Sequence, residues 1–194
     1  MNRDPKPIGA GKSSFDLIDV DTFASALALE PGDTVLDAAC GPGRYTLFLA
    51  GRKIPDLKIF AFDLWEDGIR NLRQTLTAEG IDGVTAEVAD ISRRIPIETA
   101  QIDLCLMATV VHDLIEAGTD SEVFSEVCRV VRPGGRLAVV EFKKIEGPPG
   151  PPVTIRLSEA DLAACVIPYG FETETVLEVG PVLYLSMFRF RGLP

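Results

Sequence analysis

The residues best suited to chemistry in this chain form a short turn between an apolar segment and a helical segment. Asp37 is the one charged residue of the otherwise apolar run 34–39. Cys40, Gly41 and Gly43 follow that run. Glycines let the backbone approach a ligand closely, and a helix that starts directly after them points its first amide groups at that ligand. An acid, a glycine turn and a helix start together predict a nucleotide-cofactor site.

A second acid stands at the distance that a ribose requires. In dinucleotide sites, an acid about 20 residues after the glycine turn accepts hydrogen bonds from ribose hydroxyls. Asp63 occupies that place and closes the β-branched and aromatic segment 58–63. Asp90 ends the next extended segment, and His112 lies in the turn after segment 102–108. The polar strand ends therefore predict a site at one edge of a sheet.

The glycine turn by itself is compatible with two other interpretations. A nicotinamide-binding turn needs a third glycine three residues after the second, and Thr46 stands there. A tight turn without a ligand is the other alternative. Asp63 and Asp90, at matching strand ends, count against that second alternative.

Composition and charge restrict the class of protein. The 194 residues fit one domain, and the 46% apolar and 25% charged content is typical of globular chains. No apolar run approaches the roughly 20 residues that cross a bilayer, and the polar N-terminus lacks a signal-peptide core. The formal net charge of −10 repels nucleic-acid phosphates and anionic membranes. We expect a cytoplasmic protein with a small-molecule substrate, no nucleic-acid partner and no membrane span, and its oligomeric state stays open.

Metal ligands and disulfides are not expected. The four cysteines are far apart in the sequence, and none belongs to a C-x-x-C pair. The chain has a single histidine, so no cluster offers metal-ligand spacing. The cysteines are expected to be reduced residues of the core.

Extended and helical segments alternate along the chain after a first helix expected at 14–29. This alternation predicts an α/β fold with a doubly wound, mostly parallel sheet. Capping boxes that begin at Thr119 and Ser158 predict two helix starts. Segments 171–179 and 182–190, separated by a Gly-Pro pair, predict an antiparallel hairpin at the sheet edge.

The order of these features resembles the class I S-adenosylmethionine-dependent methyltransferases. Their motif I reads D-x-G-x-G-x-G, with Asp37, Gly41 and Gly43 in register and Ala39 at the first glycine. The turn 131–135, V-R-P-G-G, and the C-terminal hairpin also resemble that family. The N-terminal and proline-rich segments are similar to its ubiquinone/menaquinone-methyltransferase-like branch, methyltransferase types 11 and 25.

The resemblance implies a Rossmann-like sheet of seven strands, S-adenosyl-L-methionine as cofactor and in-line methyl transfer to a small-molecule O, N or C atom. It divides the single domain into an N-terminal arm and helix (1–30), a cofactor-binding core (31–142), a proline-rich loop (143–157) and a C-terminal helix and hairpin (158–194). The cofactor-binding residues that it implies are Asp37, Cys40, Gly41, Gly43, Asp63, Leu64, Asp90, Ile91 and Ala108. Among them, Asp37 would reach the amino group, Asp63 the ribose hydroxyls, and Leu64 and Asp90 the adenine.

Catalytic chemistry is assigned to His112, because an imidazole with a pKa near 6.5 can act as a general base. The alternative is a histidine that is merely hydrogen-bonded at a helix start. Asp113 either orients that ring or caps the following segment. Lys143 or Lys144 would attract an anionic substrate beneath a proline-rich flap, unless the proline-rich stretch is only a solvated connector. A second function stays open, namely a regulatory or interaction protein that binds S-adenosylmethionine without transferring methyl.

Overall fold

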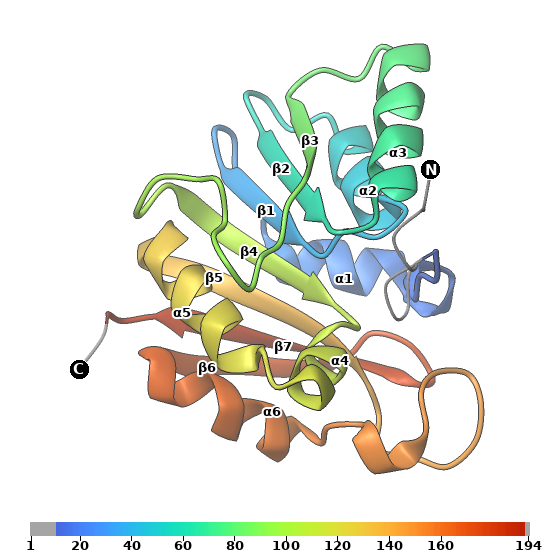
Figure 1. Cartoon of the computed structure of the whole chain (residues 1–194), viewed down its shortest axis with the longest axis vertical. Coiled ribbons are helices and arrows are strands. Elements are labelled where there is room, and N and C mark those ends of the chain that lie inside the picture. The colour runs from blue at the N-terminus through green and yellow to red at the C-terminus, as the bar shows by residue number, and fades with distance from the viewer. Residues whose placement is uncertain (1–10, 193–194) are drawn as a thin grey trace.

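The computed structural model describes residues 11–192, so part of the expected N-terminal arm and the last two residues lie outside it. Its centre is a seven-stranded sheet in the order β3-β2-β1-β4-β5-β7-β6 (Figure 1). Strands β1 to β5 pair in parallel, and β7 runs antiparallel to both of its neighbours. The predicted α/β class, the mostly parallel sheet and the C-terminal hairpin are confirmed.

Most strand boundaries lie close to the predicted ones. The strands are β1 (Thr34–Ala38), β2 (Lys58–Asp63), β3 (Val84–Val88), β4 (Ile102–Ala108), β5 (Val131–Phe142), β6 (Phe171–Glu178) and β7 (Leu183–Phe190). The α-helices are α1 (Val20–Leu27), α2 (Arg44–Gly51), α3 (Glu66–Ala78), α4 (Val111–Ala117), α5 (Asp120–Val130) and α6 (Glu159–Val166).

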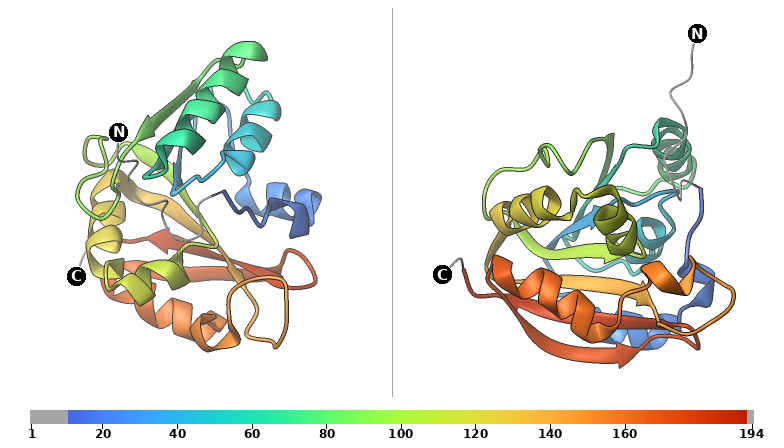
Figure 2. Two further views of the ribbon diagram at one scale, coloured as in Figure 1. Left: turned by 45° about the vertical axis from the view of Figure 1, so that its right-hand side comes forward. Right: turned by 60° about the horizontal axis from the view of Figure 1, so that its bottom comes forward.

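Helices cover both faces of the sheet. Helices α1 to α3 lie on one face and α4 to α6 on the other, as the two turned views make plain (Figure 2). Val35 and Leu36 are both fully buried, yet they belong to hydrophobic clusters on opposite faces, because neighbouring side chains of a strand point in opposite directions. The uninterrupted apolar runs of the strands follow from this two-sided burial.

Two expected helix starts differ in detail. The segment 14–29 is not one helix, because Ile18 is extended and separates a 3₁₀ helix, Phe15–Leu17, from α1. Asp19 then caps α1 by accepting a hydrogen bond from the Thr22 amide. Thr119 precedes α5 without a side-chain cap, whereas Ser158 forms both bonds of the predicted capping box.

The expected turn 131–135 belongs to a strand. Val131 pairs with Ile102 and Arg136 pairs with Leu104, so residues 132–135 of β5 lie opposite the single residue Asp103 of β4 and form a bulge. The sequence Arg-Pro-Gly-Gly therefore distorts the start of β5 instead of preceding it.

Within residues 11–192 the structure has neither a membrane-spanning helix nor a metal-binding cluster. No helix there is long and apolar enough to cross a membrane. No group of three or more His, Cys, Asp or Glu side chains in that range could hold a metal ion. The four cysteines are free thiols.

Candidate cofactor and catalytic site

The turn after β1 requires backbone angles that favour glycine. Residues Ala39, Gly41 and Gly43 have φ angles of 58°, 55° and 78°, all in the left-handed region. A Cβ atom at Gly43 would also lie 2.6 Å from Cδ1 of Leu72 on α3. The motif I positions are thus explained by geometry, and Ala39 carries the strain that a glycine would avoid.

Asp63 braces this turn from the end of β2. Its Oδ2 accepts a hydrogen bond of 2.7 Å from the Gly41 amide, and its Oδ1 accepts one of 2.7 Å from the Trp65 amide. In the first turn of α3, a Cβ atom at Gly68 would lie 2.9 Å from the Gly41 carbonyl oxygen. The acid predicted for the ribose therefore also fixes the glycine turn against α3, a role that sequence spacing does not reveal.

Asp37 lies beneath the turn and is almost completely buried. Its Oδ2 accepts a 2.5 Å hydrogen bond from the hydroxyl of Thr46, the residue that replaces the third glycine of a nicotinamide turn. Burial, opposed by the Thr46 hydrogen bond and aided by the charge of Asp63, raises the pKa of Asp37 to about 7. Burial likewise raises the pKa of the adjacent Cys40 thiol, so that this side chain is an inert part of the core.

The ends of β2 and β3 differ in polarity. Leu64, directly after β2, exposes 54% of its surface, which is unusual for an apolar residue of this size. Asp90 accepts hydrogen bonds from the Ser92 amide (3.0 Å) and the Ser92 hydroxyl (2.6 Å) on one oxygen. Ile91 beside it is buried. An exposed apolar side chain and a fixed acid at adjacent strand ends fit an adenine-like ring.

His112 lies in the first turn of α4 and is 4% exposed. Its Nδ1 is 2.8 Å from Oε2 of Glu141, and its backbone amide donates to Oε1 of the same carboxylate at 3.2 Å. Burial lowers the pKa of His112, but the hydrogen bond and charge of Glu141, with the charge of Asp113, outweigh burial and raise it above 6.5. Asp113 lies inside the first turn and is not the capping residue of α4.

Glu141 was missed in the sequence analysis. It is completely buried near the end of β5, two residues from the start of the proline-rich segment. The signal was available, because Glu141 is the one acid in the apolar stretch 137–142, the same pattern that singled out Asp37.

The proline-rich loop surrounds the side chain of Arg156. Arg156 is 2% exposed, and its guanidinium group stacks on the Phe142 ring with 5.5 Å between Cζ and the ring centroid. All five of its N–H groups donate to backbone carbonyls of the loop at 2.7–3.3 Å, those of Lys143, Ile145, Gly147, Pro149 and Pro151. The loop is therefore a fixed wall beside the end of β5.

The two lysines of this loop have partners of their own. Lys143 pairs with Glu178 of β6 at 2.9 Å, and Lys144 pairs with Asp161 of α6 at 3.0 Å. The charge of each lysine is compensated by an acid of β6 or α6. The geometry thus gives no support to the expectation that one lysine attracts an anionic substrate.

The segment before the first 3₁₀ helix crosses the site. Ser14 is buried, and its hydroxyl oxygen is 2.9 Å from the Tyr45 hydroxyl and 3.1 Å from Oγ1 of Thr109, just after β4. The Phe15 ring meets the Tyr45 ring edge-on, with 5.1 Å between centroids. These aromatic side chains pack with each other and, through Phe23, with α1.

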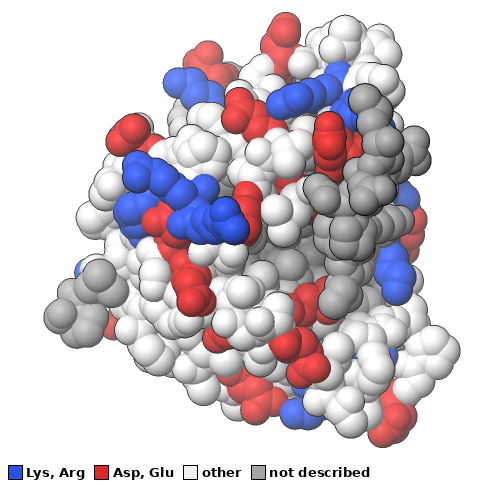
Figure 3. All heavy atoms as spheres, viewed as in Figure 1, with Lys and Arg blue, Asp and Glu red and all other residues white. Residues whose placement is uncertain are grey.

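Charges alternate on the face that Figure 3 shows, where a group of Lys and Arg side chains lies among acidic neighbours. Among the basic side chains that the structure describes, Arg129 pairs with Glu126 of the same helix, and Arg93 lies 3.4 Å from Asp90. A continuous basic surface for nucleic acid is not formed there.

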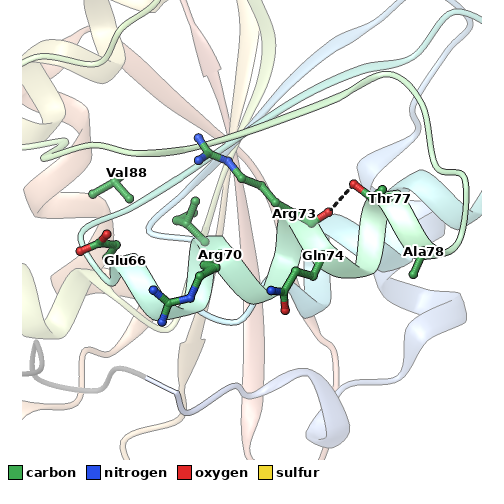
Figure 4. A pocket seen from close by; sticks show the side chains of 8 residues that line it. Glu66, Arg70, Arg73, Gln74, Thr77, Ala78 and Val88 are labelled. Carbon is green, nitrogen blue, oxygen red and sulfur yellow. Dashed lines mark hydrogen bonds between the residues drawn. The ribbon is translucent and has the colours of Figure 1, made fainter.

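A hollow of about 530 Å³ lies elsewhere, along α3 and the end of β3. Figure 4 shows Glu66, Arg70 and Gln74 lining it from α3, with Val88 opposite. Arg73 spans it and donates to the Ala86 carbonyl at 2.6 Å. Since none of the predicted cofactor residues lines this hollow, we do not identify it with the site at the carboxyl ends of the strands.

A sheet of this order, with a glycine turn that an acid of β2 braces, defines the architecture of class I S-adenosylmethionine-dependent methyltransferases. Residues 35–135 match the family model described as a methyltransferase domain, and this match spans slightly more than half of the chain. The chain therefore belongs to the methyltransferase domain family, whose cofactor is S-adenosylmethionine.

Relatives of known structure and curated relatives agree with this assignment. The chain is 25% identical to an S-adenosylmethionine-dependent methyltransferase from Aquifex aeolicus, with a TM-score of 0.82. The superposition covers 91% of this chain and 92% of the Aquifex chain. It is 31% identical over 120 residues to the ubiquinone/menaquinone biosynthesis C-methyltransferase UbiE of Hydrogenovibrio crunogenus, 62% of this chain and 46% of the relative. It is 27% identical over 140 residues to the arsenite methyltransferase of Halobacterium salinarum, 72% of this chain and 34% of the relative. The chain thus spans less than half the length of both curated relatives.

Proposed function

We propose that the protein transfers the methyl group of S-adenosylmethionine to an oxygen, nitrogen or carbon atom of a small molecule. The observation that carries this proposal is the double hydrogen bond of Asp63 to the amides of Gly41 and Trp65. It presets the turn in which the nucleoside would lie. Each carboxylate oxygen also retains a second acceptor position, which a ribose hydroxyl can use.

The remaining predicted residues take complementary parts in the proposal. Asp37 and the backbone from Cys40 to Gly43 would hold the methionine part and ribose, and Leu64, Asp90 and Ile91 would hold adenine. Ala108, at the end of β4, would contact the cofactor on the side that faces the acceptor. The bound cofactor supplies a methyl group on a positively charged sulfur. The protein's own contribution is to align the acceptor and exclude water.

The identity of the acceptor is a separate matter. The two curated relatives are named for arsenite and for a C-methylation in ubiquinone and menaquinone biosynthesis, so relatives of similar identity are named for different chemistry. We include His112 as the general base, because it lies in the first turn of α4, four residues after Ala108 at the end of β4.

Thermal denaturation with added ligands tests the proposal. S-adenosylmethionine and S-adenosylhomocysteine should each raise the melting temperature, because a ligand of the native state stabilises it by mass action, while NAD should have no effect. Stabilisation by NAD alone would refute the proposal.

A screen for transfer of a labelled methyl group then separates an enzyme from a binding protein. Transfer to a metabolite supports catalysis. Binding of S-adenosylhomocysteine with no transfer to any member of a broad set of O, N and C acceptors supports the regulatory alternative.

A further inference from the structure

The Glu141 carboxylate contacts three nitrogen atoms at the carboxyl end of β5, and two of them belong to His112. Oε2 lies 2.8 Å from Nδ1 of the ring and 3.3 Å from the Phe142 amide, while Oε1 lies 3.2 Å from the His112 amide. An ionised carboxylate only accepts hydrogen bonds, so Nδ1 carries a proton and the neutral ring keeps its lone pair on Nε2. The contact therefore sets both the tautomer and the orientation of the ring.

The other ring nitrogen lies on the Asp113 side of the ring. Nε2 lies 3.6 Å from Oδ1 of Asp113, which is too far for a hydrogen bond. The Asp113 side chain is 29% exposed, whereas that of Glu141 is fully buried, so the Asp113 side of the ring lies nearer to solvent.

Charge around the ring favours proton uptake. Glu141 faces it from β5 and Asp113 from α4, while the guanidinium group of Arg156 opposes them. The five N–H groups of Arg156 are committed to carbonyl oxygens, so its hydrogen bonds do not go to Glu141. Tyr184 of β7 is the further titratable group near Glu141, and burial raises its pKa, which keeps it neutral. When His112 takes up a proton, its positive charge therefore compensates the charge of the buried carboxylate.

We propose that His112 is the general base and Glu141 is the residue that positions it. The acceptor is then one whose nucleophilic atom carries a proton, such as a phenol, an enol or a carbon acid. This inference rests on the proposed function. In the step, Nε2 takes the proton from the acceptor and the electron pair so released forms the bond to the methyl carbon. The electrons of the broken S–C bond stay on sulfur, which becomes a neutral thioether. The proton resides on His112 beside Glu141 until it is released to solvent.

The single histidine of the chain makes the pair directly observable. Nitrogen NMR of the untagged protein without ligand reports the tautomer and the pKa of His112 alone. We expect the Nδ1–H tautomer and a pKa above 6.5, with a fall of about one unit or more in Glu141→Gln, because an opposite charge at hydrogen-bond distance shifts a pKa by that amount. An Nε2–H tautomer, or an unchanged pKa in the variant, would overturn the pairing.

Glu141→Asp is the matched variant, because it keeps the charge and shortens the reach. It also serves if Glu141→Gln does not fold, since an amide group would face the His112 or Phe142 N–H group. We expect the pKa of His112 in Glu141→Asp to stay above that in Glu141→Gln, or above 6.5 if only the aspartate variant folds. A fall below 6.5 in Glu141→Asp contradicts charge compensation by the carboxylate.

Methyl-transfer kinetics complete the test once an acceptor is found. The rate should rise with pH through the pKa of His112, since only the neutral ring accepts a proton, and this limb should move to lower pH in Glu141→Gln with at least a tenfold lower plateau. His112→Gln should lower kcat about a hundredfold with little change in affinity for S-adenosylhomocysteine. Transfer only to acceptors without a proton on the nucleophilic atom, at a rate that His112→Gln does not change, would refute the inference. A failure of the proposed function itself would appear separately, as a lack of stabilisation by S-adenosylhomocysteine.

Discussion

Replacing Asp63 by alanine should weaken both the fold and cofactor binding. The carboxylate accepts two backbone hydrogen bonds of 2.7 Å, from Gly41 and Trp65. Hydrogen bonds to a charged group contribute about 1.5–3 kcal/mol each, and partial exposure places these at the low end. Since water can hydrate the freed amides in part, we expect the free energy of unfolding to fall by about 2 kcal/mol. Removal of an acid that only bound ribose would leave the free energy of unfolding almost unchanged.

The loss of binding is expected to exceed what one ribose contact would give. Removing the ribose acceptors costs about 1.5–3 kcal/mol, which raises the Kd roughly tenfold to a hundredfold. A loosened glycine turn adds to this, because the ligand must then order it. Titration calorimetry with S-adenosylhomocysteine measures the affinity, and chemical denaturation without ligand measures the stability.

Two further variants make the reasoning refutable. Asp63→Asn replaces one acceptor oxygen by an amide group that faces a backbone N–H group, so its stability should fall about as far as in Asp63→Ala. Asp67→Ala removes a half-exposed acid of α3 that pairs with Arg70, and should change the stability by less than about 1 kcal/mol. Unchanged affinity in Asp63→Ala, or wild-type stability in Asp63→Asn, would show that this carboxylate does not hold the turn.

Three other predictions address strain, a buried acid and the loop. Ala39→Gly should stabilise the fold by up to about 1 kcal/mol in thermal denaturation, because Ala39 has a left-handed φ of 58°. The control Ala38→Gly in β1 should destabilise the fold. Equal losses of stability in the two variants would contradict backbone strain at Ala39. Burial raises the pKa of Asp37 to about 7 from 3.8, so the folded protein keeps a proton that the unfolded chain loses, and wild-type stability falls between these pH values. Asp37→Asn should therefore gain stability relative to wild type as the pH rises from about 4 to 7, and a constant difference in chemical denaturation would refute this. Arg156→Lys should cost about 3 kcal/mol and speed proteolysis of the loop, because three donors cannot serve five carbonyls, while Arg191→Lys on the surface should change little.

Local patterns in the sequence were sufficient for most of the elements. The boundaries of β2 and β4 agree with the apolar segments 58–63 and 102–108, since each is a short apolar run that ends at polar or turn residues. The first helix was predicted less well, because its apolar spacing continues across Ile18 while the backbone there is extended. A capping box likewise predicts a helix start correctly at Thr119 without the side-chain bond that defines it.

The candidate site was also predicted only in part from the sequence. The sequence determined that Asp37, the glycine turn and Asp63 would meet, because acids and turns that follow parallel strands must gather at the carboxyl edge of the sheet. Only the tertiary structure decided that Asp63 braces Gly41 and that Glu141 grips His112 across 29 residues of sequence. It also turned the five carbonyls of the proline-rich loop toward Arg156. Such contacts depend on strand register and on the direction of each side chain, and neither is encoded in the spacing of residues along the chain.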